Sequence, residues 1–189
     1  MSAHQSRPEA RPEGEPETVW EGEYIKVRKL GTWEFVSRTR GVTAAVMLAV
    51  DEGHVLLVEQ YRVPLGSMSL ELPAGLVGDE QEGEDVCAAA VRELEEETGY
   101  KAERMIELGR FNASPGMSSE GFTLYRAEGL SKTGEGGGVE GEEIAVHRVR
   151  LDQVPAFVER KRRDGVAIDV KLLLLLAAVF LEPVRLSGD

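Results

Sequence analysis

Three glutamates in one short stretch of the sequence have the type and spacing suited to metal chemistry. Glu93, Glu96 and Glu97 stand at positions i, i+3 and i+4, so in a helix their carboxylates share one face. Like charges at this spacing destabilise a helix by roughly 0.2–0.5 kcal/mol for each pair. Acidic side chains in the last helical turn also oppose the helix dipole. An acidic face turned to solvent is one reading, and a face that binds a cation is the other.

A divalent cation would relieve the repulsion among these glutamates. Hard cations prefer clustered carboxylate oxygens, and magnesium uses one or two carboxylates together with substrate phosphates and water. We therefore predict that this face binds Mg²⁺ or Mn²⁺. The guanidinium of the adjacent Arg92 is suited to hold one carboxylate in place by a charge-assisted hydrogen bond.

The helix that must carry these glutamates is predicted over residues 84–98. The segment contains no proline or glycine, and Gly99 stands where a left-handed C-terminal cap is expected. Apolar residues recur at helical spacing at Cys87, Ala90, Val91 and Leu94. This stripe predicts a buried face, in which Cys87 is a small core residue rather than a nucleophile.

The same stretch contains a longer pattern of fixed spacing. Gly78, Glu84 and the run RELEEETGY at 92–100 together resemble the signature of the Nudix hydrolases. Every fixed position is present, and Tyr100 stands where an aliphatic residue is more usual. The resemblance implies an α/β fold, a Nudix-type α/β/α sandwich with a mixed sheet. It also implies metal-dependent hydrolysis of a nucleoside diphosphate linked to another group.

The resemblance assigns roles to particular residues. It implies that Glu93, Glu96 and Glu97 are metal ligands, with the backbone carbonyl of Ala74 beside them, and that the cofactor is Mg²⁺ or alternatively Mn²⁺. Structural support of the site is expected from Gly78, Arg92 and Glu71. A strand-end surface charge is the other reading of Glu71.

Further motifs indicate a branch of the family. EQYR at 59–62, ELPAGL at 71–76 and SPG at 114–116 look like the ADP-ribose pyrophosphatase branch. The run WEFVSR at 33–38 is similar to the N-terminal segment of that branch, in which a tryptophan stacks on adenine. The resemblance covers residues 18–182. It implies cleavage of ADP-ribose or a related ADP-sugar to AMP and a sugar phosphate.

Substrate binding is expected from Trp33, Arg38, Arg62 and Leu76. An indole stacks well on a nucleobase, and a guanidinium suits bidentate binding of phosphate. Packing within a strand is the alternative for Trp33, and a surface position is the alternative for the arginines. Because Met117 and Ser119 depart from the branch pattern, hydrolysis of another nucleotide sugar such as GDP-mannose stays open. A Nudix-like module that senses a nucleotide without cleaving it is a third reading.

A general base is expected in a glycine-rich segment late in the chain. Residues 133–141 contain five glycines and predict a mobile loop. In the resembled branch such a loop supplies the glutamate that takes the proton from water. We expect Glu142 in this role, with Glu140 second and Glu97 of the helix as the alternative. Solvated loop charges are the competing interpretation.

Composition limits the partners of the chain. The 189 residues carry a formal charge of −12, which argues against binding nucleic acid or an anionic membrane, since like charges repel. A single cysteine and the lack of an apolar leader predict a cytoplasmic protein. The longest apolar run, 172–181, is too short to span a bilayer and is expected in the core or a dimer interface.

The elements around these motifs predict a mixed α/β chain. We expect strands at 20–27, 33–39, 42–50, 54–60, 70–72, 105–111, 121–127 and 144–150, a turn at 73–75, and helices at 84–98, 152–163 and 169–181. The organisation follows as a disordered acidic, proline-rich tail at 1–17, an N-terminal β segment at 18–40 and a Nudix domain at 41–182. Relatives are homodimers whose N-terminal strands complete the partner's site, which implies that Trp33 acts across the interface.

Overall fold

The computed structural model of the chain describes residues 12–39, 42–77, 85–139 and 141–181, the last four by backbone alone. Gly78, Glu84, Glu140 and residues 1–11 of the predicted tail lie outside these ranges. The described chain forms two compact units. One contains the N-terminal strands and residues 112–120, and the other contains residues 42–111 and the chain from Gly121 onward.

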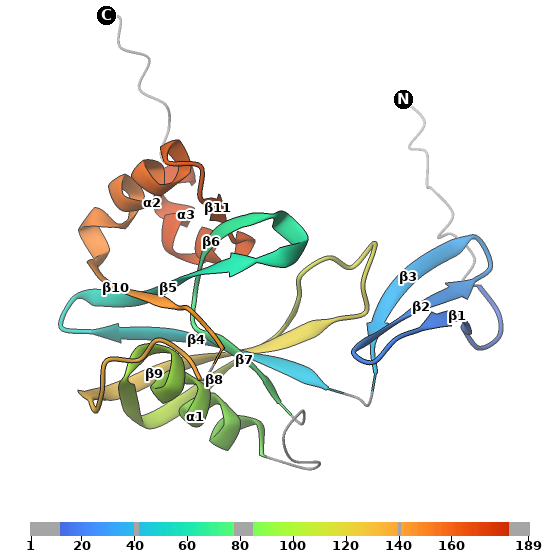
Figure 1. Cartoon of the computed structure of the whole chain (residues 1–189), viewed down its shortest axis with the longest axis horizontal. Helices are drawn as coiled ribbons and strands as arrows, with labels where there is room; N and C mark the ends of the chain where they lie inside the picture. The colour runs from blue at the N-terminus through green and yellow to red at the C-terminus, as the bar shows by residue number, and fades with distance from the viewer. Residues whose placement is uncertain (1–11, 40–41, 78–84, 140, 182–189) are drawn as a thin grey trace, which may run out of the picture. The chain divides into compact units, whose positions relative to one another are not determined.

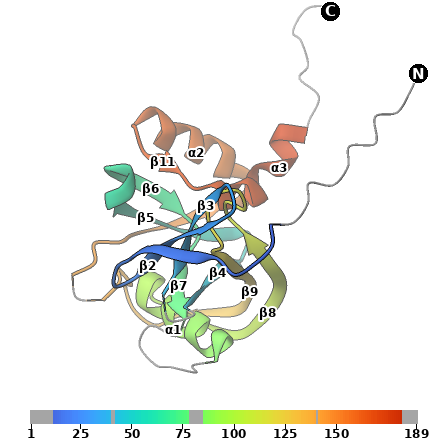
Figure 2. The same ribbon diagram turned by 90° about the vertical axis from the view of Figure 1, so that its right-hand side faces the viewer.

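The first unit is a three-stranded antiparallel sheet in the order β1-β2-β3 (Figure 2). Its strands are β1 (Glu17–Glu21), β2 (Ile25–Leu30) and β3 (Trp33–Arg38). The single strand predicted at 20–27 was wrong, because the chain turns between β1 and β2, where the Gly22 N–H donates to the Ile25 carbonyl over 2.9 Å. The segment 112–120 joins β3 through two backbone hydrogen bonds of 2.9 Å on Val36.

The second unit is built on one mixed sheet. Its strands are β4 (Thr43–Asp51), β5 (His54–Arg62), β6 (Ser67–Glu71), β7 (Ala74–Val77), β8 (Tyr100–Asn112), β9 (Gly121–Lys132), β10 (Ala145–Arg150) and β11 (Ala167–Ile168). The order is β11-β6-β5-β4-β9-β8, with β10 paired to β5 and β7 paired to β4. Two pairs, β4–β9 and β6–β11, are parallel, whereas β4–β7, β5–β6 and β5–β10 are antiparallel.

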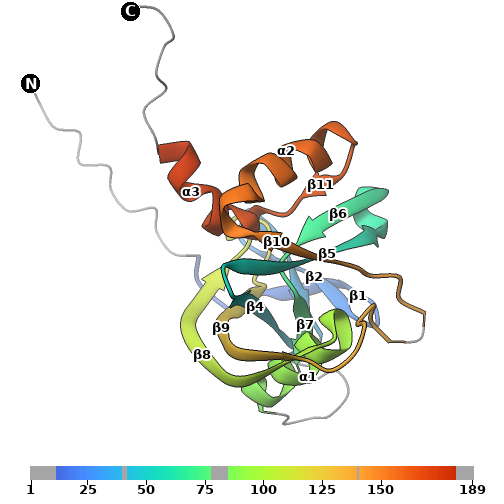
Figure 3. The same ribbon diagram turned by 90° about the vertical axis from the view of Figure 1, so that its left-hand side faces the viewer.

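Helices cover both faces of this sheet (Figure 1). They are α1 (Val86–Thr98), α2 (Val154–Arg163) and α3 (Leu173–Leu181), and single turns of 3₁₀ helix stand at Val63–Leu65, Leu151–Gln153 and Val170–Leu172. Helix α1 lies on one side of the strands, and α2 and α3 lie on the other, as Figure 3 also shows. The α/β/α arrangement with a mixed sheet confirms the predicted fold class.

Alternation along β5 separates two hydrophobic cores. The Leu56 side chain packs with Ala90 and Leu94 of α1. Its neighbours Val55 and Leu57 pack on the opposite face with Val158 of α2 and with α3. Successive side chains of a strand point to opposite faces, so one strand contributes to both layers.

Helix α1 begins and ends where the sequence supplies caps. The Asp85 carboxylate accepts from the backbone N–H groups of Cys87 and Ala88 at 3.1 and 3.0 Å. At the other end Gly99 has φ of 73° and donates its N–H to the Glu95 carbonyl, which confirms the predicted left-handed cap. Cys87 packs at the edge of the core with α1.

One other expectation needs correction. The predicted turn at 73–75 is instead the start of β7, since Ala74 and Gly75 pair with Val46 and Ala45 of β4. In the apolar run at 172–181, Leu172 is buried, whereas Leu173 and Leu174 are exposed in the single chain, and their burial in a dimer interface stays a prediction. None of the helices in the described ranges is long and apolar enough to cross a membrane.

Candidate active site

The last two turns of α1 hold the three candidate glutamates at different depths. Glu97 is 6% exposed, whereas the Glu93 and Glu96 side chains are 16% and 34% exposed. A fully solvated acidic face, the plain alternative from the sequence, would leave all three open to water. Glu93 and Glu97 are instead largely buried, and both lie against the β7 strand of the sheet.

Glu97 reaches from α1 to the first residue of β7. The Ala74 N–H donates to Glu97 Oε2 at 3.0 Å. Burial raises the pKa of Glu97 to about 8, the Ala74 hydrogen bond works against this, and the charges of Glu93 and Glu142 raise it further. Without a cation, Glu97 therefore carries a proton at neutral pH.

Arg92 compensates the other two carboxylates. Its Nη1 lies 2.9 Å from Glu93 Oε1 and 3.0 Å from Glu96 Oε2. The sequence predicted that Arg92 would hold one carboxylate, and the structure shows that it holds two. The acidic helix end is thus stabilised by a guanidinium and by the proton on Glu97.

Gly75 in β7 lets the glutamates approach the sheet. A side chain at this position would overlap the carboxyl group of Glu93. The absence of a Cβ is therefore what allows Glu93 to lie against the β7 backbone. Ala74 and Gly75 together bring the strand to both Glu93 and Glu97.

The donor set fits a hard divalent cation in its chemistry. Across residues 12–39, 42–77, 85–139 and 141–181, no three His, Cys, Asp or Glu side chains lie close enough together to hold a metal as they stand. In the described residues, the Arg92 guanidinium balances the charges of Glu93 and Glu96, and the raised pKa of Glu97 favours its neutral form. A bound cation can balance all three carboxylates instead. Carboxylate oxygens beside a strand backbone are the donors that magnesium and manganese prefer.

Arg62 and Glu71 form a bidentate ion pair at the edge of β5 and β6. Arg62 Nε and Nη2 donate to the two Glu71 carboxylate oxygens at 2.8 and 2.7 Å. Burial works to raise the pKa of Glu71, but the Arg62 hydrogen bonds and charge outweigh it and hold the pKa below its ordinary value. The Glu71 hydrogen bond raises the pKa of Arg62, and the charge of Glu97 contributes to the same shift. The pair therefore lies within electrostatic reach of α1.

The glycine-rich loop is anchored on the end of α1. The N–H groups of Gly137 and Gly138 donate to the carbonyls of Glu97 and Glu96 at 2.9 and 3.0 Å. Gly136, with φ of 68°, lies so close to the α1 backbone at Thr98 that a side chain would clash with it. These contacts satisfy carbonyls that the last helical turn leaves without partners inside the helix.

Glu142 follows this loop. Its Oε2 accepts from the Val139 N–H at 3.1 Å, and its charge acts on Glu97. The loop therefore places one candidate base in the electrostatic field of the α1 carboxylates. The other candidate base, Glu140, lies outside the described residues.

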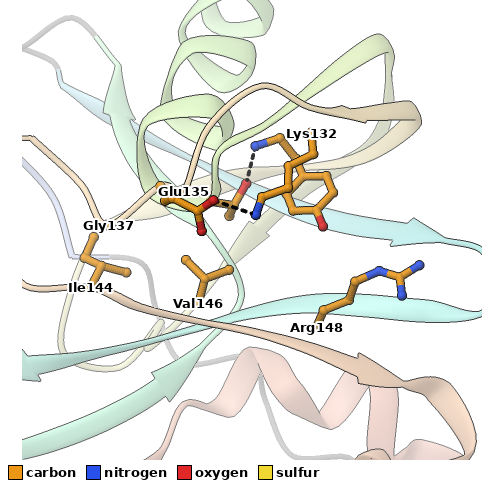
Figure 4. A pocket seen from close by; sticks show the side chains of 9 residues that line it. Lys132, Glu135, Gly137, Ile144, Val146 and Arg148 are labelled. Atoms are coloured by element: carbon orange, nitrogen blue, oxygen red, sulfur yellow. Dashed lines mark hydrogen bonds and ion pairs between the residues drawn. The ribbon is translucent and has the colours of Figure 1, made fainter.

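A hollow of about 300 Å³ lies next to the α1 end (Figure 4). Thr98, Tyr100, the loop and one face of β10 line it, and Lys132 pairs there with Glu135 at 3.0 Å. Figure 4 shows Val146 and Arg148 rising into it from the same strand. None of the three α1 glutamates lines this hollow, so it is separate from the candidate metal ligands.

The other predicted substrate residues are described within their own units. Trp33 is an exposed side chain of β3, which argues against a role as core packing. Arg38 in the same unit donates to Glu120 at 2.7 Å. Leu76 lies in β7 of the second unit, opposite Ala44.

The sequence did not predict a polar cluster that lies on the α2 side of the sheet. His147 Nε2 and Lys161 Nζ lie 2.8 and 2.5 Å from the same oxygen of Glu59, Oε2. The three residues are far apart in the chain, and no local spacing connects them. Only the pairing of β5 with β10, which sets Glu59 beside Ala145, could have indicated the contact.

Curated relatives match a large part of the sequence. A methanol dehydrogenase activator of Bacillus methanolicus is 40% identical over 62% of this chain and 63% of its own length. An ADP-ribose pyrophosphatase of Bacillus subtilis (strain 168) is 36% identical over 62% of each chain. The chain thus spans less than two thirds of the length of these two relatives. A GDP-mannose pyrophosphatase of Cronobacter sakazakii is 37% identical over 72% of each chain.

The fold has a counterpart among solved structures. The crystal structure of an ADP compounds hydrolase superposes with a TM-score of 0.64, covering 88% of this chain and 91% of its own, at 22% sequence identity. The sequence model of the NUDIX domain matches residues 39–169, which is more than half of the chain. That match includes α1, β7 and the glycine-rich loop, and the chain belongs to the Nudix family.

Proposed function

We propose that this chain hydrolyses the pyrophosphate bond of ADP-ribose or a related ADP-sugar, giving AMP and a sugar phosphate, with Mg²⁺ or Mn²⁺ as cofactor. The observation that carries the proposal is the partly buried set of carboxylates at the end of α1, held against β7. Relatives named for ADP-ribose pyrophosphatase activity support the substrate class. Intact glutamates argue against a module that only senses a nucleotide.

In this proposal, Glu93, Glu96 and Glu97 hold the cation together with the Ala74 carbonyl. The cation, when bound, neutralises the charge of the diphosphate and makes water more acidic. Arg92 keeps Glu93 and Glu96 in place while the site is being loaded, as its two short contacts indicate. The site without a cation is anionic, so nucleotide binding depends on the divalent ion.

Arg62 is the phosphate ligand in this proposal. Glu71 accepts from Nε and Nη2, which holds the guanidinium in one orientation, and we assign the diphosphate contact to Nη1. A bidentate ion pair that fixes the guanidinium in advance reduces the entropy lost on binding. Leu76, and across a homodimer interface Trp33 and Arg38, complete the substrate contacts in this proposal.

Glu142 takes the proton of the attacking water. Its charge already acts on Glu97, and the loop before it is tied to α1 by two backbone hydrogen bonds. Glu140 is the second candidate, and Glu97 itself is the third. A cytoplasmic location and a homodimer without nucleic-acid or membrane partners complete the proposal.

A second candidate substrate is GDP-mannose, which the Cronobacter sakazakii relative favours through its name and its coverage of 72% of both chains. A substrate panel separates the two. We expect the kcat/KM for ADP-ribose to exceed that for GDP-mannose at equal Mg²⁺, with AMP and ribose 5-phosphate as products. A higher kcat/KM for GDP-mannose would transfer the assignment to that substrate.

A further inference from the structure

A second hollow, of about 410 Å³, opens along β10 beside α2. Its charged and aromatic lining residues are His54, His147, Arg148, Arg150, Phe157 and Arg160, and no Asp or Glu side chain lines it. In a chain with a formal charge of −12, this concentration of cations is unusual. It is the opposite of the carboxylate-rich end of α1.

The hollow lies along β10, and residues from both faces of this strand line it. Val149, which lines it, belongs to the core that α2 and α3 share with the sheet. The Phe157 ring packs on the His147 ring at 5.2 Å. Helix α1 covers the other face, and none of the three α1 glutamates lines this hollow. Val146 and Arg148 line this hollow and also the one beside the α1 end.

Two of the three arginines of the hollow pair with exposed acidic side chains outside its lining. Arg148 pairs with Glu52 at 3.1 Å and Arg150 with Asp152 at 2.8 Å, and these acidic side chains are 80% and 62% exposed. The Arg148–Glu52 pair is a single exposed contact, which contributes little because water competes for both charges. Asp152 binds Arg150 through both Nε and Nη2, at 3.0 and 2.8 Å, so a ligand of Arg150 must displace this carboxylate. Arg160 lies over the Phe157 ring at 5.4 Å and makes no ion pair within the described part of the chain.

The nearest buried acid does not oppose an anion. Glu59 contacts both Lys161 and His147. Burial works to raise the pKa of Glu59, but these partners outweigh it and hold the pKa below its ordinary value. The negative charge of Glu59 is therefore matched locally by Lys161.

We propose that this hollow binds a small molecule that carries a phosphate group. The guanidinium groups of Arg148, Arg150 and Arg160 supply fork-shaped donors that match phosphate oxygens, and Phe157 supplies an apolar wall. The volume lies within the range of small-molecule sites. The inference goes beyond the proposed function and does not rest on it, because cationic side chains replace the divalent ion that the α1 site requires.

Calorimetric titration of the full chain in EDTA tests the proposal. The probes are inorganic phosphate, AMP and ribose 5-phosphate, each without divalent ions. We expect saturable binding, and we expect Arg160→Ala to weaken it by about tenfold, which is typical for one lost charge-assisted contact. Arg148→Ala should weaken it similarly. Arg163→Ala removes the same charge from the same exposed helix turn, outside the hollow, and should bind as the wild type does.

Several outcomes decide the matter. Tighter binding of AMP than of phosphate would support a contact of the base with Phe157, and equal binding would support recognition of the phosphate alone. Absence of binding in EDTA, or equal weakening by Arg160→Ala and Arg163→Ala, would overturn the proposal. Glu97→Gln should abolish the proposed hydrolysis and leave this binding unchanged, so the failure of either proposal is recognisable separately.

Discussion

The buried Glu97 carboxylate makes the stability of the metal-free chain depend on pH. In the folded chain the pKa of Glu97 is about 8, against an ordinary value of 4.5. Each pH unit of difference corresponds to about 1.4 kcal/mol. Ionisation of Glu97 therefore destabilises the folded chain by roughly 5 kcal/mol, which is comparable to the whole stability of many domains.

The sign follows from the bound protons. Below pH 4.5 the carboxyl group is protonated in both the folded and the unfolded chain, so it contributes no pH dependence. Between 4.5 and about 8 the folded chain keeps a proton that the unfolded chain releases. The free energy of unfolding therefore falls as pH rises through this window and becomes level again, for this group, above it.

Glu97→Gln removes the charge and keeps an oxygen that can accept from the Ala74 N–H. In urea unfolding with EDTA, we expect the variant to match the wild type near about pH 5 and to be several kcal/mol more stable near about pH 9. Glu96→Gln is the matched control, because that side chain is more exposed, and it should keep the wild-type slope. Parallel curves for the wild type and Glu97→Gln would refute the reasoning.

Three further changes test the site. Gly75→Ala places a methyl group against the carboxyl group of Glu93, so the divalent-ion affinity measured by calorimetry should fall by about tenfold or more. Gly116 has open space around it, and Gly116→Ala should leave that affinity unchanged. Arg62→Ala leaves its buried carboxylate partner without the bidentate contact and should lower the free energy of unfolding by about 1–3 kcal/mol; an unchanged urea midpoint would contradict this. Glu142→Gln should lower kcat by about 10²-fold or more and Glu143→Gln should not; equal kcat values would remove Glu142 from the chemistry.

Local signals in the sequence located the helix that carries the glutamates. Asp85 and Gly99 have the side chain and the backbone freedom that cap a helix, and α1 begins and ends beside them. The nearly unbroken apolar run at 42–50 likewise indicated a buried strand, the later β4, because a strand between two layers must be apolar on both faces. These features depend on neighbouring residues only.

The depth of Glu97 and its contact with Ala74 depended on tertiary pairing. The sequence predicted Gly75 as part of a turn after Pro73. The pairing of β7 with β4 instead makes it a strand residue that lies against Glu93. The double contact of Arg92 followed from side-chain geometry at the end of α1. Spacing on a helical wheel gives the shared face of a group of residues, but not how far each one is buried.

The central claim is that the carboxylates at the end of α1 bind the divalent ion on which hydrolysis depends. Calorimetric titration of Mg²⁺ and Mn²⁺ into the full chain tests it most directly, with Glu96→Gln and Glu97→Gln beside the wild type. We predict saturable binding by the wild type, its loss in both variants, and a parallel loss of ADP-ribose hydrolysis. Divalent-ion binding that is absent in the wild type, or that is unchanged in both variants, would contradict the claim.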